Sequence, residues 1–194
     1  MRGVEQIPWL YDLGMAAIEA TGLGRWRRWL VSGAQGRVLD VGCGTGRNLA
    51  LLDTPSPPVG IDPCLPSLRA AHRRAPQAWL VQARAEALPF GDGVFDTVLS
   101  GLVFCSVSDP PAGLREVRRV LRTGGTFRLL EHVRAEPAWQ AWLQDRLQPL
   151  WTRITGGCHP NRETERAVEG AGFRAEPGSR RARGTMRRWL TRPG

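Results

Sequence analysis

Three closely spaced glycines are the clearest chemical signal in this sequence. Gly42, Gly44 and Gly46 follow an apolar run at 37–41, so the backbone there can turn sharply and approach a ligand without Cβ clashes. A dinucleotide-binding loop would need glycine where the chain has Arg47, and a phosphate-binding P-loop would need a lysine, which the chain lacks entirely. The spacing therefore favours a nucleoside ligand that carries no phosphate chain.

Two carboxylates are expected beside this glycine turn. Asp62 ends a second apolar run at 59–62, 20 residues after Gly42. From that place its carboxylate can accept hydrogen bonds from ribose hydroxyls. Asp40, just before the turn, is expected at the same edge of the fold, where its negative charge suits a cationic ligand.

Two histidines and a tyrosine are the candidate catalytic residues. His132 follows the last expected strand and His159 lies in a glycine-rich segment, so each is a candidate general base near the binding edge. A structural role stays open for both: His132 as partner of a backbone carbonyl, and His159 beside a helix at 162–170 capped by Asn161. Tyr11, on the N-terminal helix, is expected to help roof a small apolar pocket.

The elements that must position these residues alternate along the chain. Expected strands lie at 37–41, 59–62, 79–82, 95–100 and 126–130, and expected helices at 8–20, 23–30, 48–53, 65–75 and 114–121. This order implies an α/β fold: a doubly wound, mostly parallel sheet with helices on both faces and an N-terminal helical cap. Ligands of such sheets bind beyond the carboxyl ends of the strands.

Two C-terminal features leave alternatives open. Apolar residues at 139, 142, 143, 147 and 150 form a helical stripe within 138–151. It can pack on the sheet, join Trp9 and Tyr11 over the pocket, or do both. The segment 185–191 either forms the last strand of the sheet or leaves the sheet one strand short.

Length and composition narrow the class of protein. The 194 residues, 42% hydrophobic and 23% charged, suit one folded domain: an N-terminal cap (1–35), a ligand-binding core (36–131) and an acceptor-side C-terminal segment (132–194). Four cysteines without a C-x-x-C pair argue against a disulfide scaffold or a zinc ribbon, and no metal site is expected. We expect no transmembrane segment and no secretory signal, and therefore a cytoplasmic protein.

The charge is strongly basic, with a formal net charge of +9 and arginine as the sole source of the 27 basic side chains. Six arginines cluster near the C-terminus, at 180, 181, 183, 187, 188 and 192. Such a cluster can attract nucleic acid or anionic lipid. We favour a solvated basic edge, and a nucleic-acid partner is not expected.

Several of these segments together resemble one family, the class I S-adenosylmethionine-dependent methyltransferases of the type 11 group, whose fold is Rossmann-like. Residues 40–46 resemble the family's first motif and Asp62 its ribose-binding acid, while 85–90, 95–96 and 114–125 resemble later motifs. The resemblance implies S-adenosylmethionine as cofactor. It implies cofactor contacts from ten residues: Asp40, Gly42, Cys43, Gly44, Gly46, Asp62, Pro63, Ala85, Glu86 and Ser100. One departure is Arg84, which stands where many members have an aspartate that binds the adenine amino group.

A narrower resemblance concerns the methyl acceptor. Residues 102–107, 130–133 and 156–163 look like those of small-molecule thiol S-methyltransferases. Those relatives carry an N-terminal membrane anchor, which is not expected here. The resemblance implies a small apolar acceptor, a thiol first, methylated by in-line displacement, which acts largely by positioning. The alternatives are carbon methylation of a quinol-like ring, or nucleic-acid binding through the C-terminal arginines.

One pair of cysteines also has two interpretations. Cys105 and Cys158 either face the acceptor pocket together, where they could hold a soft metalloid, or are separate, buried and inert. The sequence leaves their proximity open, and it leaves the oligomeric state open as well.

Overall fold

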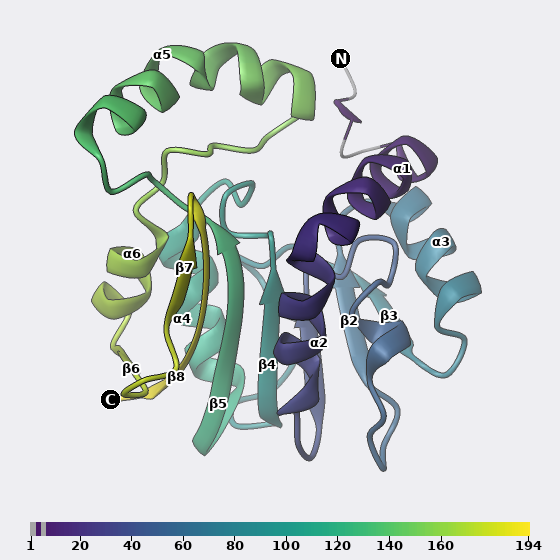
Figure 1. Cartoon of the computed structure of the whole chain (residues 1–194). Coiled ribbons are helices and arrows are strands. Elements are labelled where there is room, and N and C mark those ends of the chain that lie inside the picture. The colour runs from purple at the N-terminus through teal and green to yellow at the C-terminus, as the bar shows by residue number, and fades with distance from the viewer. Residues whose placement is uncertain (1–2, 5–6) are drawn as a thin grey trace.

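The strands form one mixed sheet in the computed structural model, which describes residues 3–4 and 7–194. Within these residues the sheet has eight strands in the order β3-β2-β1-β4-β5-β8-β6, and β7 pairs with β8 (Figure 1). The strands are β1 (Val38–Val41), β2 (Val59–Asp62), β3 (Trp79–Gln82), β4 (Phe95–Gly101), β5 (Leu121–His132), β6 (Phe173–Ala175), β7 (Arg181–Arg183) and β8 (Met186–Pro193). The first five run parallel and the last three pair antiparallel, which confirms the expected doubly wound, mostly parallel sheet.

Helices cover both faces of this sheet (Figure 1). They are α1 (Pro8–Ile18), α2 (Gly24–Ser32), α3 (Leu65–Arg74), α4 (Pro110–Val120), α5 (Ala138–Thr155) and α6 (Thr164–Gly170), with a π-helical turn η2 (Glu19–Leu23) and a 3-10 turn η3 (Leu49–Leu51). Side chains of β1 alternate between the two faces, as a pleated strand requires. Leu39 packs in the core that holds Leu114 of α4, whereas Val38 packs in the core that holds Leu30 of α2 and Leu68 of α3.

The antiparallel end of the sheet resolves the open question about the last strand. β8 lies between β5 and β6, with Leu129 opposite Trp189 and Phe173 opposite Pro193. The segment expected at 185–191 is therefore a strand, and it is an interior one. Trp189 is buried there in the same core as Leu129.

Two expected helices differ in the structure. The segment 48–53 forms only the short turn η3, because three prolines follow at 55, 57 and 58 and the side chain of Asn48 is bonded to Asp40. The helix expected at 162–170 begins at Thr164, and Asn161 does not cap it. Instead the Asn161 amide donates a hydrogen bond to Asp145 of α5, at 2.9 Å.

The apolar stripe of α5 does not pack on the sheet, so that interpretation is wrong. Within α5 only Ala141 and Thr155 are buried, while Trp139, Trp142 and Leu147 are exposed. The reason is that the sheet faces beside β5 are already covered by α2 and α4, so α5 lies beyond the carboxyl ends of the strands (Figure 1). None of the helices that the structure describes is long and apolar enough to cross a bilayer.

Much of the basic C-terminal segment is engaged in structural contacts. Arg187 is fully buried and pairs with Glu136 at 3.0 Å, and Arg180 pairs with the same carboxylate at 2.8 Å. The guanidinium of Arg188 lies 4.5 Å from the centre of the Trp29 ring. The prediction of a solvated basic edge is therefore wrong for Arg187, whereas Arg181 and Arg183 of β7 are exposed.

Candidate functional site

The turn after β1 can be formed only by glycine at two of its positions. Gly42 and Gly46 both have positive φ, +62° and +80°. A Cβ on Gly42 would lie 2.6 Å from Val103, and one on Gly46 would lie 2.9 Å from the backbone of Ala71. A Cβ on Gly44, in contrast, would meet nothing within 4 Å. The backbone at Gly44 therefore borders open space at the carboxyl edge of the sheet.

Asp62 joins this turn to the end of β2. Its Oδ2 accepts a hydrogen bond from the Gly44 N–H at 3.0 Å, and its Oδ1 accepts one from the Cys64 N–H at 2.8 Å. Burial raises the pKa of Asp62, although the two N–H donors oppose this effect. Cys43 fixes the other side of the turn, because its N–H donates to the Ile61 carbonyl at 2.8 Å and its side chain is buried.

Asp40 is completely buried near the end of β1, and only one of its two carboxylate oxygens has a hydrogen-bond partner among the described residues. Its Oδ1 accepts from the Asn48 amide at 2.8 Å, and Asn48 in turn accepts from Arg27 at 2.6 Å. Its Oδ2 has no hydrogen-bond partner among the described residues. Burial raises the pKa of Asp40 to about 7. An unsatisfied buried carboxylate oxygen is costly, so a cationic donor at this position would stabilise it.

A network of ion pairs holds the N-terminal cap over the glycine turn. Asp12 of α1 accepts from the Thr45 hydroxyl at 2.7 Å and pairs with Arg74 at 2.7 Å. Glu19 pairs with Arg47, directly after the turn. Sequence reasoning missed this network, since the partners come from segments far apart in the chain and neither carboxylate lies in a motif.

The loop after β3 holds the next group of predicted residues. Ala85 is buried, and Pro63 is exposed at the end of β2. Glu86 accepts hydrogen bonds from the Ser108 N–H at 3.0 Å and from Arg84 at 3.1 Å, so its side chain joins this loop to the start of α4. Burial acts to raise the pKa of Glu86, but hydrogen bonds from its own N–H, from the Asp109 N–H and from Arg84 outweigh it and lower the pKa.

The end of β5 holds a buried carboxyl group that sequence reasoning did not single out. Glu131 is completely buried, and its Oε1 accepts from the Ser100 hydroxyl at 2.5 Å. Ser100, predicted to bind the cofactor, therefore has its hydroxyl engaged inside the protein. Leu102 adopts a left-handed φ of +66°, and the next N–H, of Val103, points at Glu131 Oε2 at 3.1 Å. Burial raises the pKa of Glu131 to about 7.

Cys105 and Cys158, whose proximity the sequence leaves open, lie next to each other and next to His132. Cys105 and Cys158 are buried, their thiols hydrogen-bond to each other, and Cys158 also bonds to His132 and Trp151. The Cys105 hydrogen bond lowers the pKa of Cys158 against the effect of burial, and His132 lowers it further. The pKa of Cys105 is raised in turn. The two cysteines therefore lie together, and their mutual hydrogen bond favours the ionised form of Cys158 over that of Cys105.

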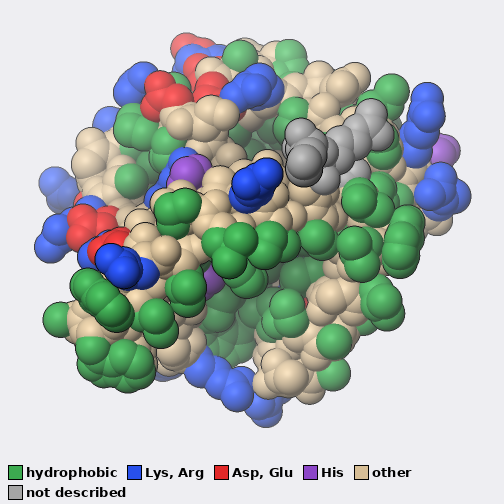
Figure 2. All heavy atoms as spheres, turned by 90° about the horizontal axis from the view of Figure 1, so that it is seen from above, with side chains coloured by type: hydrophobic (Ala, Val, Ile, Leu, Met, Phe, Trp, Pro, Cys, Tyr) green, Lys and Arg blue, Asp and Glu red, His purple; other side chains and the backbone are tan. Residues whose placement is uncertain are grey.

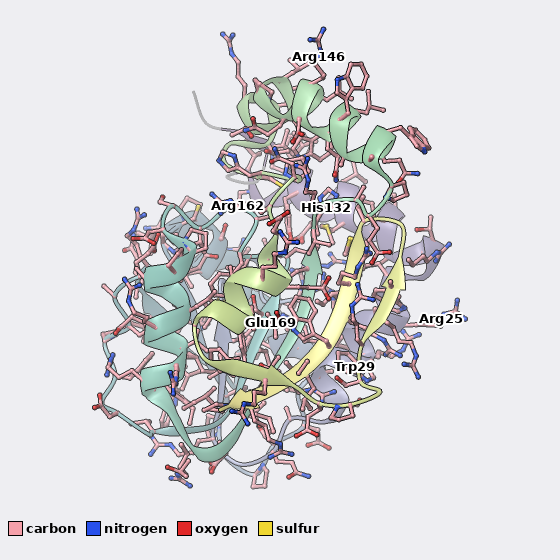
Figure 3. The ribbon with its side chains drawn as sticks, turned by 90° about the vertical axis from the view of Figure 1, so that its left-hand side faces the viewer. Arg25, Trp29, His132, Arg146, Arg162 and Glu169 are labelled. Carbon is pink, nitrogen blue, oxygen red and sulfur yellow. The ribbon has the colours of Figure 1, made fainter. Side chains whose placement is uncertain are left out.

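His159 lies beside this cluster, whereas Tyr11 lies on α1. The His159 N–H donates to the Cys105 carbonyl at 2.8 Å, and its Nδ1 bonds to Gln148 of α5 at 2.9 Å. Burial lowers the pKa of His159. Figure 3 shows His132 and Arg162 in the region between α5 and the sheet. Tyr11 is half-buried on α1 and packs against the core that holds Leu30.

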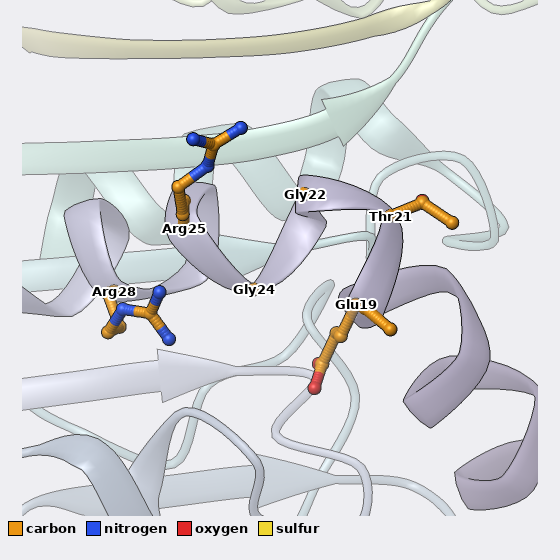
Figure 4. A pocket seen from close by; sticks show the side chains of 7 residues that line it. Glu19, Thr21, Gly22, Gly24, Arg25 and Arg28 are labelled. Carbon is orange, nitrogen blue, oxygen red and sulfur yellow. The ribbon is translucent and has the colours of Figure 1, made fainter.

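Two hollows elsewhere on the molecule are poorer candidates for an active site than the edge that holds the glycine turn and the end of β5. One, of about 350 Å³, lies at the junction of α1 and α2, and Figure 4 shows its lining side chains Glu19, Thr21, Arg25 and Arg28. Its carboxylate, Glu19, is already paired with Arg27 and Arg47. The other, of about 540 Å³, lies at the opposite edge of the sheet, beside the start of β4. Neither includes a residue of the glycine turn.

Comparisons with known proteins agree on the family. The methyltransferase domain family matches residues 39–129. The human thiol S-methyltransferase TMT1A is 36% identical over 144 residues, which cover 70% of this chain and 59% of the human protein. A demethylmenaquinone methyltransferase of Roseiflexus castenholzii is 38% identical over 160 residues, 75% of this chain and 67% of that protein. The chain thus spans about 60% of the length of the human relative.

Solved structures share the fold. A SAM-dependent methyltransferase from Thermotoga maritima superposes with a TM-score of 0.68 at 20% identity, covering 87% of this chain and 88% of that one. A methyltransferase in complex with the Haloferax volcanii Trm112 activator gives a TM-score of 0.75 at 16% identity, covering 100% and 99%. With the family match and the sequence relatives, the glycine turn and its acidic partner have one explanation: the chain belongs to the class I S-adenosylmethionine-dependent methyltransferases.

Proposed function

We propose that this chain transfers the methyl group of S-adenosylmethionine to a small apolar acceptor, with a thiol as the preferred class. The observation that carries the proposal is the placement of two groups of residues at one edge of the sheet. Asp40 is the last residue but one of β1 and Asp62 ends β2, and the cluster of Glu131, His132 and Cys158 lies at the end of β5. A donor site and a proton-accepting site therefore share the edge where such sheets bind ligands.

The residues present fit S-adenosylmethionine. The free Oδ2 of Asp40 suits a positively charged ligand, and the open space beside Gly44 lets a ligand approach the backbone. Each oxygen of Asp62 accepts one backbone N–H and has a further lone pair for a ribose hydroxyl. When bound, the cofactor supplies an electrophilic methyl group on a sulfonium. Backbone contacts near Pro63, Ala85 and Glu86 remain predictions.

The cluster at the end of β5 can take the proton of an acceptor thiol. A thiol with an ordinary pKa of about 8.5 needs little help to ionise near neutral pH. His132 can accept that proton as a general base, and the negative charge of Cys158 beside it stabilises the imidazolium that forms. Alignment of acceptor and methyl group then provides most of the acceleration, about 7–11 kcal/mol in well-oriented reactions. His159 and Tyr11 remain candidates for positioning the acceptor.

A second candidate is carbon methylation of a quinol-like ring. The observation that favours it is the relative from Roseiflexus castenholzii, a demethylmenaquinone methyltransferase, which is 38% identical. Glu131 is relevant to this alternative, because a buried carboxyl group with a pKa of about 7 is a stronger base than an ordinary one. We do not propose a nucleic-acid partner, since Arg180, Arg187 and Arg188 are held by internal contacts. A cytoplasmic location stays a prediction.

Purified protein tests the two acceptors directly. It is incubated with S-adenosylmethionine and either a small alkyl thiol or a reduced demethylated quinone, and S-adenosylhomocysteine is measured. Turnover with the thiol alone supports the preferred acceptor, and turnover with the quinol alone supports the second candidate. Tight cofactor binding without turnover on either would overturn both acceptor assignments while leaving the donor site in place. Absence of cofactor binding would overturn the donor site itself.

A further inference from the structure

Helix α5 has its polar side toward the protein and its apolar side toward solvent. Gln144 bonds to the backbone at Ala135 (2.8 Å) and Pro160 (3.0 Å), Gln148 bonds to His159, and the Thr152 hydroxyl donates to the Cys158 carbonyl at 2.8 Å. The large apolar side chains on the other side are all exposed: Trp139, Trp142, Leu143, Leu147, Leu150 and Ile154. Trp151 lies at the border between the two sides, because it is partly exposed and also bonds to Cys158. Such a helix is inverted compared with ordinary surface helices of globular proteins.

Helix α1 extends this exposed surface. Trp9, Leu13 and Ile18 of α1 are exposed, with Trp9 at 70%. Figure 1 shows α1 and α5 at the same end of the molecule, beyond the carboxyl ends of the strands. Viewed onto that end, Figure 2 shows hydrophobic side chains gathered around a hollow. Trp9 and Leu13 lie on one side of α1 and Ile18 lies on the opposite side. We call Trp9, Leu13 and the exposed apolar side chains of α5 the apolar face. Contiguous exposed apolar surface of this kind marks an interaction site.

Two unpaired arginines lie within the apolar stripe of α5. Arg146 and Arg153 follow the same helical spacing as Leu143 and Leu150, and neither forms an ion pair with any residue that the structure describes. The Arg146 guanidinium lies 5.6 Å from the Trp142 ring centre, and Figure 3 shows Arg146 pointing away from the body of the protein. The one acidic side chain on α5, Asp145, is neutralised by Arg134 at 2.7 Å. The face is therefore apolar and positively charged.

We propose that the apolar face docks on an anionic lipid surface. Tryptophan and arginine are the side chains suited to the boundary between headgroups and acyl chains, where an amphipathic helix lies in the plane of the membrane. A second copy of the chain is a poorer occupant. It would bring the unpaired Arg146 and Arg153 of both copies together, on molecules with a formal net charge of +9 each.

Docking in this way has a consequence for the site, which rests on the function proposed above. The two helices flank the sheet edge that holds Asp62 and His132, so that edge would face the lipid. An apolar acceptor dissolved in the membrane would then reach the site without crossing water. The docking itself does not depend on methyl transfer, and its test uses no substrate.

Vesicle flotation with the purified full chain tests the proposal. Vesicles of phosphatidylcholine alone are compared with vesicles that contain an equal amount of phosphatidylglycerol. We expect binding to the mixed vesicles that weakens with added salt. The double variant Trp142→Gln, Leu147→Gln should weaken that binding by about tenfold or more, since two apolar side chains lose their burial in lipid. The double variant Arg146→Gln, Arg153→Gln should weaken binding to the mixed vesicles only.

Trp79 provides the matched control. It is 61% exposed, as Trp142 is, but it lies at the amino end of β3, away from the apolar face. The variant Trp79→Gln should bind vesicles like the parent. Vesicle binding that the Trp142 and Leu147 changes leave intact, or no binding at all, would overturn the proposal. A dimer that sedimentation detects in the parent and not in that variant, without vesicle binding, would identify a second copy as the occupant instead.

Discussion

Replacing Asp40 with asparagine should weaken S-adenosylmethionine binding and remove part of its pH dependence. Burial raises the pKa of Asp40 to about 7, so its ionised fraction falls from about nine-tenths at pH 8 to about one-tenth at pH 6. A cationic ligand prefers the ionised form. Binding by the parent should therefore strengthen about tenfold from pH 6 to pH 8 through this group.

The loss of S-adenosylmethionine affinity expected for Asp40→Asn at pH 8 follows from the unpartnered Oδ2 of Asp40. A hydrogen bond to a charged group contributes about 1.5–3 kcal/mol, which corresponds to an affinity about 10- to 150-fold weaker in Asp40→Asn. The Asn48 hydrogen bond to Oδ1 can be kept by the asparagine carbonyl, so the fold should survive. The chain offers a matched control in Asp53→Asn, an exposed carboxylate outside the site.

Calorimetric titration of parent and variants with S-adenosylmethionine at pH 6, 7 and 8 provides the measurement. The ligand's own amino group also titrates in this range, so the informative quantity is the difference between the parent and Asp40→Asn profiles. Parallel profiles of equal affinity for these two proteins would refute the assignment of Asp40 to the cationic ligand. Circular dichroism melting curves establish that each variant is folded.

Three further predictions concern the turn and the β5 cluster. Gly42→Ala should lower the free energy of unfolding in urea by about 2–5 kcal/mol, because it combines a left-handed backbone with a close contact. Gly44→Ala should lower that free energy by only about 1–2 kcal/mol, yet it should weaken cofactor binding more than Gly42→Ala does. An equal loss of stability in both would contradict the packing argument. The parent's free energy of unfolding should fall as pH rises from about 4.5 through about 7, because the folded state keeps Glu131 protonated when the unfolded state has lost that proton. Glu131→Gln should flatten this slope, and an unchanged slope would show that Glu131 ionises as freely as in the unfolded chain. Cys158→Ser should lower kcat for a thiol about 100-fold or more without changing the cofactor Kd, and unchanged kcat would exclude its role in proton transfer.

The parallel half of the fold and the glycine turn after its first strand were predictable from the sequence. Each strand there is a short apolar run, and the glycines at 42, 44 and 46 interrupt the pattern at the point where the backbone turns. Asp62 was predictable for the same reason, since it ends the next apolar run, 20 residues after Gly42. These signals are local, and each depends on neighbours in the chain.

The features that sequence reasoning missed depend on contacts between distant segments. Glu131 looked like an ordinary charge at the end of a strand, and only its partners Ser100 and Val103 show that it is buried. The interpretation that α5 packs on the sheet was wrong, because periodicity identifies an apolar stripe without saying what the stripe faces. Arg187 looked like surface charge, and its burial depends on Glu136 and on the pairing of β8.

The position of β8 constrains how this protein can be made on the ribosome. β8 fills the gap between β5 and β6, so the backbone groups along the outer side of β5 stay unpaired until residues 186–193 have been synthesised. An open strand edge of this kind is prone to pair with other chains. The nascent protein therefore carries an open strand edge from the time β5 is made until β8 has left the ribosome, and conditions that shorten this interval should raise the yield of native protein.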